Sequence, residues 1–256
     1  MRNKFLKINI LLISVALFMA CGNNKTEQLT SPDGKIAVTF SLSDGIPFYS
    51  VQKNGKDVIA ASKLGFKLNV EDSLCSGFKI IDVSVDSLNE TWQQPWGEEI
   101  EVRNHYNGLK ISLQENSGKQ RLLNIVFRAF DEGVGFCYEF PEQQNLHEFE
   151  IADELTEFAL VADDSAWTIP AYKGEYYEVI WKKQPVSKSD TVTTPVTIET
   201  SGGGFILLHE AKLVDYAKMN LYPVSGTTLK ADLTPWSTGV KVYAKTPFTT
   251  PWRTIV

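Results

Sequence analysis

Tryptophan and acidic residues are clustered in one short segment, Trp92-Gln93-Gln94-Pro95-Trp96-Gly97-Glu98-Glu99. Two tryptophans four residues apart enclose a proline and are followed by two glutamates. Tryptophan rings stack on sugar rings, and carboxylates accept hydrogen bonds from sugar hydroxyls. The segment therefore predicts a carbohydrate contact, with Trp96 as its candidate residue. The alternative is that both rings pack in the core or in an interface.

A second cluster of acidic and aromatic residues follows Asp163-Asp164 and reads Trp167-Thr168-Ile169-Pro170-Ala171-Tyr172-Lys173-Gly174-Glu175-Tyr176-Tyr177-Glu178. Calcium takes several oxygen ligands, and Glu175 or Glu178 could supply one of them. The segment lacks the spacing of a self-contained calcium loop, so any such site needs ligands from elsewhere. The alternative is that these carboxylates are solvated at strand ends.

A third candidate segment is Leu207-Leu208-His209-Glu210-Ala211-Lys212-Leu213-Val214-Asp215-Tyr216. Glu210 follows an apolar strand, and Asp215 comes five residues later. Two carboxylates at a suitable separation are the machinery of glycoside hydrolysis, but the sequence does not supply that separation. Glu210 beside His209 is equally compatible with a polar pair at a strand end.

Several other chemistries have no support in the sequence. The three cysteines and three histidines are scattered, and Cys-x-x-Cys, Gly-x-Ser-x-Gly and phosphate-binding loops are absent. Gly202-Gly203-Gly204 instead indicates a hairpin turn. The chain has 25 basic and 31 acidic residues, a net charge of −6, which argues against binding of nucleic acid.

The first twenty residues are typical of an export signal, because three basic residues precede an apolar run from Ile8 to Ala20. The junction Leu17-Phe18-Met19-Ala20-Cys21 resembles the lipobox of bacterial lipoproteins, in which the cysteine becomes the lipidated first residue. We therefore expect an exported protein anchored in the bacterial envelope, at the periplasm or outer membrane, through Cys21. An ordinary cleaved signal is the alternative. Residues 21–28 are expected to form a polar tether, and Cys75 and Cys137 to be free thiols.

From Leu29 onward, apolar runs of four to nine residues alternate with turn residues. Asn54-Gly55 between two such runs predicts a tight β-hairpin. Residues 148–160 fit a helix by composition but fit two strands and a turn about as well, and residues 184–194 read as a polar surface loop. Roughly fifteen short strands without a convincing helical stripe predict an all-β fold, a large antiparallel sandwich of two sheets.

Taken in order, these segments resemble the N-terminal domain of glycoside hydrolase family 97. The resemblance also covers Ser31-Pro32-Asp33-Gly34-Lys35, Asn54-Gly55-Lys56, Leu64-Gly65-Phe66, Val102-Arg103-Asn104, Phe130-Asp131-Glu132-Gly133-Val134-Gly135-Phe136, Leu233-Thr234-Pro235-Trp236 and Thr250-Pro251-Trp252-Arg253-Thr254-Ile255. Members of that family resemble exported bacterial α-glucosidases and α-galactosidases that act on α-linked oligosaccharides. The resemblance implies a β-super-sandwich of the galactose-mutarotase-like kind, followed in the family by a catalytic (β/α)₈ barrel.

The resemblance also implies roles for particular residues. The catalytic carboxylates of the family lie on the barrel, so no catalytic residue is expected in this chain. The sandwich lends one glutamate to a calcium ion near the sugar, and by motif that glutamate corresponds to Glu178, with Glu175 three residues away. Trp96 and Glu210 are weaker candidates for lining the sugar cleft.

The expected organisation is a signal peptide (1–20), a tether (21–28), a β-sandwich (29–247) and the start of a connection to the barrel (248–256). We expect the chain to be a piece of a calcium-dependent α-glycosidase, without hydrolase activity of its own. The alternative is a stand-alone, lipid-anchored glycan-binding sandwich.

Overall fold

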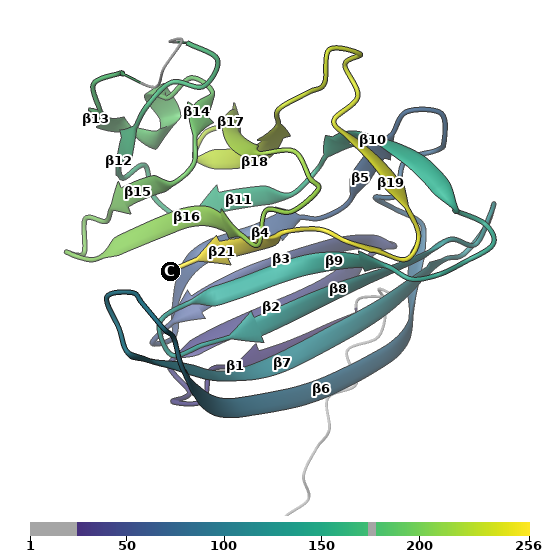
Figure 1. The fold of residues 1–256 in the computed structure, drawn as a ribbon, viewed down its shortest axis with the longest axis horizontal. Helices are drawn as coiled ribbons and strands as arrows, with labels where there is room; N and C mark the ends of the chain where they lie inside the picture. The colour runs from purple at the N-terminus through teal and green to yellow at the C-terminus, as the bar shows by residue number, and fades with distance from the viewer. Residues whose placement is uncertain (1–24, 174–177) are drawn as a thin grey trace, which may run out of the picture.

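The computed structural model describes residues 25–173 and 178–256, and these residues form an all-β protein (Figure 1). Among them there is no α-helix, and a single 3₁₀ turn, Val186–Lys188, interrupts the strands. No helix in these ranges is long and apolar enough to cross a membrane. The predicted fold class, an antiparallel β-sandwich, is confirmed.

The strands form two large sheets and a small third one. The eight-stranded sheet has the order β1-β2-β3-β4-β11-β18-β17-β14. Its strands are β1 (Lys25–Thr30), β2 (Ile36–Ser43), β3 (Ile46–Lys53), β4 (Lys56–Lys63), β11 (Glu157–Leu160), β18 (Thr228–Leu233), β17 (Met219–Ser225) and β14 (Val192–Thr193). The three-stranded sheet is β19-β10-β5, made of Val242–Lys245, Glu148–Glu154 and Phe66–Leu68.

The ten-stranded sheet has the order β13-β12-β15-β16-β21-β9-β8-β7-β6, with β20 paired to β9. Its strands are β13 (Lys182–Pro185), β12 (Ser165–Thr168), β15 (Val196–Glu199), β16 (Phe205–Ala211), β21 (Trp252–Ile255), β9 (Val134–Phe140), β8 (Leu122–Ala129), β7 (Glu101–Glu115), β6 (Phe78–Gln93) and β20 (Phe248–Thr249).

The core lies between the two large sheets, which face each other in Figure 1. Side chains of β2 alternate between buried and half-buried along its whole length, because successive residues of a strand point to opposite faces. Aromatic rings join the layers: the ring centroids of Tyr49 on β3 and Phe136 on β9 are 4.8 Å apart. This contact adds to the apolar burial that holds the two layers together.

The β3–β4 hairpin forms where the sequence predicts it. Asn54 and Gly55 both have positive φ, 53° and 72°, as a type I′ turn requires. Glycine has no Cβ and adopts this conformation at little cost, whereas most other residues would be strained there. The turn fixes the pairing of β3 with β4 and so places the lysines that flank it.

Residues 148–160, for which the sequence left two readings, form two strands. β10 ends at Glu154 and β11 begins at Glu157, so the strand–turn–strand reading is correct. Phe149 and Ile151 are buried at alternate positions of β10, and Phe158 and Leu160 at alternate positions of β11, which is the period of strands and not of a helix.

Other boundaries differ from the predictions. Residues 184–194, expected as a surface loop, include the end of β13, the 3₁₀ turn and β14. Lys25 to Gln28, expected in the tether, are the first part of β1 and pair with β2. Residues 248–256, expected as the start of a connection, contain β20 and β21, and β21 lies inside the ten-stranded sheet between β16 and β9.

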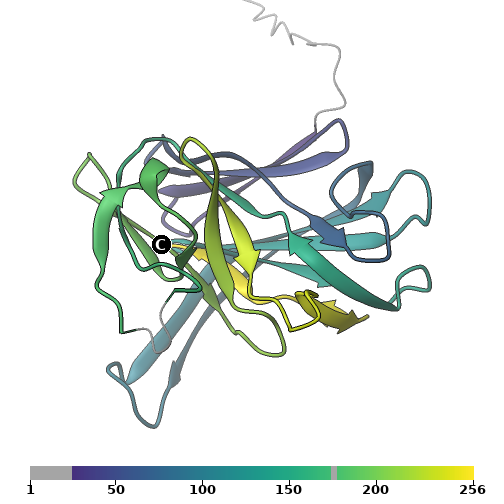
Figure 2. The ribbon, with the colours of Figure 1, turned by 90° about the horizontal axis from the view of Figure 1, so that it is seen from above.

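The β6–β7 hairpin is much longer than predicted, at 16 and 15 residues. Figure 2 shows it extending beyond the rest of the body. Its distal residues are exposed on both faces, so they lack the alternation of apolar and polar residues by which a strand is read from sequence.

A buried charged network ties β21 to two other strands. The guanidinium of Arg253, which has no exposed surface, donates to both carboxylate oxygens of Glu154 on β10, at 2.8 and 2.6 Å. Its Nη1 donates to Glu210 on β16, also at 2.8 Å. Burial alone would raise the pKa of Glu154, but the adjacent guanidinium outweighs burial and lowers it.

Neutral donors complete this Arg253–Glu154–Glu210 network. The hydroxyls of Tyr216 and Thr156 donate to Glu154, at 2.8 and 2.9 Å. The backbone N–H of Met219 donates to Glu210 at 3.0 Å. Two carboxylates and one guanidinium leave one excess negative charge in the interior, and these hydrogen bonds stabilise it.

We predict that Arg253→Met destabilises the protein at neutral pH by about 3–5 kcal/mol, because it leaves two buried carboxylates without their cation. Urea-induced unfolding followed by circular dichroism measures the change. The matched control is Arg103→Met, since Arg103 is exposed on β7 and its Nε donates to Asn89; we expect a loss of less than about 0.5 kcal/mol. Equal losses in the two variants would contradict a structural role for the network.

Candidate functional site

Glu210 lies inside the protein rather than on an open cleft. Its side chain is 4% exposed, and its oxygens accept from Arg253 and from the N–H of Met219. The geometry therefore gives Glu210 an internal role: it holds the start of β17 against β16. Direct contact with a sugar stays a prediction. Asp215, the second carboxylate of this segment, is exposed in the β16–β17 connection, where its φ is 49°.

Trp96 lies at the tip of the β6–β7 hairpin and is 85% exposed, so the structure excludes packing of this ring in the core. The loop that carries it is closed by Gln94, whose side-chain amide donates to the carbonyl of Glu99 at 2.6 Å. Trp92 lies near the end of β6, next to the hairpin turn, and is 48% exposed. The tip thus offers two aromatic rings and nearby carboxylates to solvent, and a sugar contact through Trp96 stays a prediction.

The carboxylates that precede the second cluster organise loops. Asp163 accepts from the backbone N–H and the hydroxyl of Ser187, at 2.9 and 2.7 Å. Asp164 accepts from the N–H of Ser201 at 2.9 Å. These bonds join the β12 region to the turns before β14 and after β15, so both aspartates are already occupied.

Glu178 is exposed in the segment between β12 and β13, whereas Glu175 falls outside the described residues. Within residues 25–173 and 178–256, no three His, Cys, Asp or Glu side chains come together as a metal site. Glu178 can therefore supply one carboxylate of the six to eight oxygens that calcium takes, and the others must come from elsewhere. An exposed carboxylate fits such a shared site.

The cysteines take no part in a described site. Cys21 lies outside the described residues. Cys75 and Cys137 are both free thiols, as predicted, although Cys75 is only half-buried. Burial raises the pKa of Cys137 to about 12, so this thiol stays protonated and unreactive near neutral pH.

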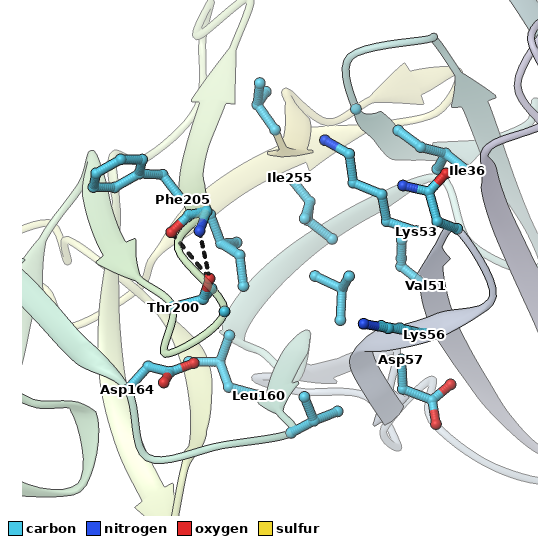
Figure 3. Close-up of a pocket in the computed structure, with 18 of the residues that line it drawn as sticks. Ile36, Val51, Lys53, Lys56, Asp57, Leu160, Asp164, Thr200, Phe205 and Ile255 are labelled. Carbon is cyan, nitrogen blue, oxygen red and sulfur yellow. Dashed lines mark hydrogen bonds between the residues drawn. The ribbon is translucent and has the colours of Figure 1, made fainter.

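A cavity of about 530 Å³ opens between the two large sheets (Figure 3). Its floor is apolar and includes Ile36, Val51, Leu160 and Ile255. Lys53, Lys56, Asp57 and Asp164 lie at its rim, and the predicted turn at 200–204, closed by Thr200 and Gly204, forms one wall. None of the sequence-predicted site residues lines this cavity, and its interior suits apolar groups rather than acid–base chemistry.

The structure thus does not assemble Trp96, Glu178 and Glu210 into one site. They lie on a hairpin tip, an exposed loop and a buried strand. The residue that sequence reasoning missed is Arg253. The sequence did contain a sign of its role. Arg253 lies on the same face of β21 as the buried Ile255, and a charged residue on a buried face requires a buried partner.

Comparison with known proteins covers most of the chain. A family model described as Glycosyl-hydrolase 97 N-terminal matches residues 29–256. A retaining alpha-galactosidase of Bacteroides thetaiotaomicron is 24% identical over 234 residues, which are 86% of this chain and 34% of that protein.

Solved structures show the same similarity. A glycoside hydrolase family 97 enzyme from Pseudoalteromonas sp. strain K8, solved with panose and also with acarbose, is 40% identical with a TM-score of 0.87 over 90% of this chain. A beta-arabinopyranosidase is 26% identical with a TM-score of 0.80, again over 90% of this chain. This chain covers 35% and 40% of those two, so it spans well under half the length of these relatives. On the family match and this agreement of folds, the chain belongs to the glycoside hydrolase 97 N-terminal domain family.

Proposed function

We propose that this chain is the N-terminal, carbohydrate-contacting domain of an exported, calcium-dependent α-glycosidase, an α-glucosidase or α-galactosidase, whose (β/α)₈ catalytic barrel lies outside these residues. The observation that carries the proposal is the family match over residues 29–256 in a chain about a third as long as its relatives. The complexes with panose and acarbose in one relative support α-linked oligosaccharides as the substrate class.

The chemistry of glycoside hydrolysis indicates which roles fall to this domain and which fall to the barrel. Hydrolysis requires two carboxyl groups that face the scissile bond, one acting as acid and the other as base or nucleophile. Glu154 and Glu210 are both bound to Arg253 in the interior and cannot face a substrate in that state. The acid and base are therefore expected on the barrel, while this domain contributes contacts and one calcium ligand.

We predict that the purified chain, residues 21–256, does not hydrolyse aryl α-glucosides or aryl α-galactosides, because the catalytic acid and base are proposed to lie on the barrel. Release of the chromogenic phenol measures turnover, with an active α-glucosidase and α-galactosidase as positive controls. Turnover above the no-enzyme rate would contradict the proposal.

Reading the gene beyond the codon of Val256 separates the proposal from its alternative. Several hundred further in-frame codons that encode a (β/α)₈ barrel support the accessory-domain function. An immediate stop codon favours a stand-alone, lipid-anchored glycan-binding protein.

We also predict that Glu178→Gln in the longer enzyme raises the calcium concentration needed for half-maximal activity at least about tenfold, because the neutral amide replaces a charged ligand. The matched variant is Glu175→Gln, three residues earlier, which we expect to respond like the wild type. A calcium dependence unchanged by Glu178→Gln would remove this residue from the metal site, and an effect confined to Glu175→Gln would transfer the role.

Anchoring through Cys21 gives a further prediction. Cys21→Ser removes the thiol that carries the acyl chains, and each buried CH₂ of such chains contributes about 0.8 kcal/mol to membrane binding. We expect the variant to lose incorporation of radiolabelled palmitate and to leave the membrane fraction. Equal labelling of the variant and the wild type would favour the ordinary cleaved signal.

A further inference from the structure

The outer face of the β17–β18 pair carries polar residues in register. Asn220 lies opposite Asp232, and Tyr222 lies opposite Lys230. Leu229, Ala231 and Leu233 point the other way into the core, so Lys230 and Asp232 lie on the face away from it. The connection from β18 to β19, yellow in Figure 1, rises beside this strand pair.

The charged residues on this face are held by neighbours from other elements. Asp232 accepts from the hydroxyl of Tyr172 at 2.8 Å and from Lys241 at 3.3 Å. Lys230 is paired with Asp153, at the end of β10. These contacts fix the side-chain positions before any ligand arrives, which lowers the entropic cost of binding.

Two hollows of about 310 and 750 Å³ adjoin on this side of the molecule, because Lys241 lines both. Both volumes lie within the range of about 300–1,000 Å³ that is usual for ligand sites. We name them together the β17–β18 groove, defined by Asp153, Lys230, Asp232, Trp236, Lys241 and Tyr243.

Two aromatic rings stand in the groove. Trp236 is 63% exposed and Tyr243 is 50% exposed, and hydrogen bonds hold the backbone of Trp236 and the hydroxyl of Tyr243. The backbone N–H of Trp236 donates to Val240 at 2.8 Å, and the Tyr243 hydroxyl shares a hydrogen bond with Thr238, also at 2.8 Å. The rings meet edge to face, with centroids 6.3 Å apart, so ring surface stays available for stacking.

The groove is electrically balanced although the whole chain is acidic. Its charged residues are Asp153, Asp215 and Asp232 against Lys218, Lys230 and Lys241. Equal numbers of carboxylates and ammonium groups give no preference for an anionic or a cationic ligand. They do place hydrogen-bond acceptors and donors side by side, which matches the hydroxyl groups of a neutral polyol.

From these features we propose that the β17–β18 groove binds a neutral oligosaccharide, with sugar rings stacked on Trp236 and Tyr243. The Asp232–Lys241 and Asp153–Lys230 pairs exchange hydrogen bonds with the hydroxyls. The residues named here all belong to this chain, and only the choice of α-linked sugars as probes rests on the proposed function.

Isothermal titration calorimetry of the purified chain with maltotriose, panose, raffinose and β-linked cellotriose tests the proposal. We expect saturable millimolar binding of at least one of them. Trp236→Ala should weaken it at least about tenfold through loss of the stacking surface, a change of about 1.4 kcal/mol. Trp181→Ala is the matched control, because Trp181 is 47% exposed and lies outside the groove, and it should bind like the wild type.

Asp232→Asn tests the polar half of the site and should also weaken binding, with thermal unfolding of every variant as the check on folding. Absence of binding to all four sugars would overturn the proposal, as would wild-type affinity in Trp236→Ala. Tighter binding of trigalacturonate than of the neutral sugars would overturn the neutral-ligand assignment. Binding of cellotriose alone would support the groove while counting against the proposed α-glycosidase function.

Discussion

The bidentate pair of Arg253 with Glu154 is the interaction on which the arrangement of strands depends. A guanidinium without exposed surface is tolerated only where its donors meet acceptors of opposite charge. Its partners lie 99 and 43 residues earlier in the chain, on β10 of the small sheet and on β16 of the large one. In the native structure the last strand is therefore tied to both elements, and the small sheet is fixed to the large one at the same point.

This constraint extends from the interior to the surface. Glu210, held by Arg253, accepts the N–H of Met219 and so sets where β17 begins. The next residue, Asn220, donates to the hydroxyl of Tyr172 at 3.1 Å, and that hydroxyl donates to Asp232. Hydrogen bonds, together with the peptide bond between Met219 and Asn220, thus connect a buried ion pair to an exposed face. Tyr172 has a φ of 59°, costly for a bulky residue, and these bonds help to hold it there.

The local parts of this fold could be read from the sequence, whereas the partners of its charges could not. Asn54-Gly55 predicted its hairpin because a turn depends on its own residues. The length of β6 and β7 was not predicted, because a strand pair that is exposed on both faces has no alternation of apolar and polar residues. The sequence offered Glu210 as a candidate for lining the sugar cleft or as part of a polar strand-end pair, and its pairing with Arg253 could not be predicted because Arg253 comes 43 residues later. The family resemblance was recognised from the order of short motifs, which does not require those contacts.

The tryptophans of this domain lie mainly at its surface. Five of the six tryptophans are at least 40% exposed, while the core between the sheets is filled mainly by aliphatic residues and phenylalanine. Exposed rings offer surface for stacking on a ligand or packing against a neighbouring domain. Their surroundings differ: Trp96 lies beside acidic residues, Trp167 lies under the ammonium group of Lys183, and Trp236 lies among balanced charges. Charge near a ring affects which ligands approach it, so the three surfaces need not bind the same ligand. The balanced charges around Trp236 suit the uncharged sugar proposed for the β17–β18 groove, and the carboxylates beside Trp96 can likewise accept hydrogen bonds from sugar hydroxyls.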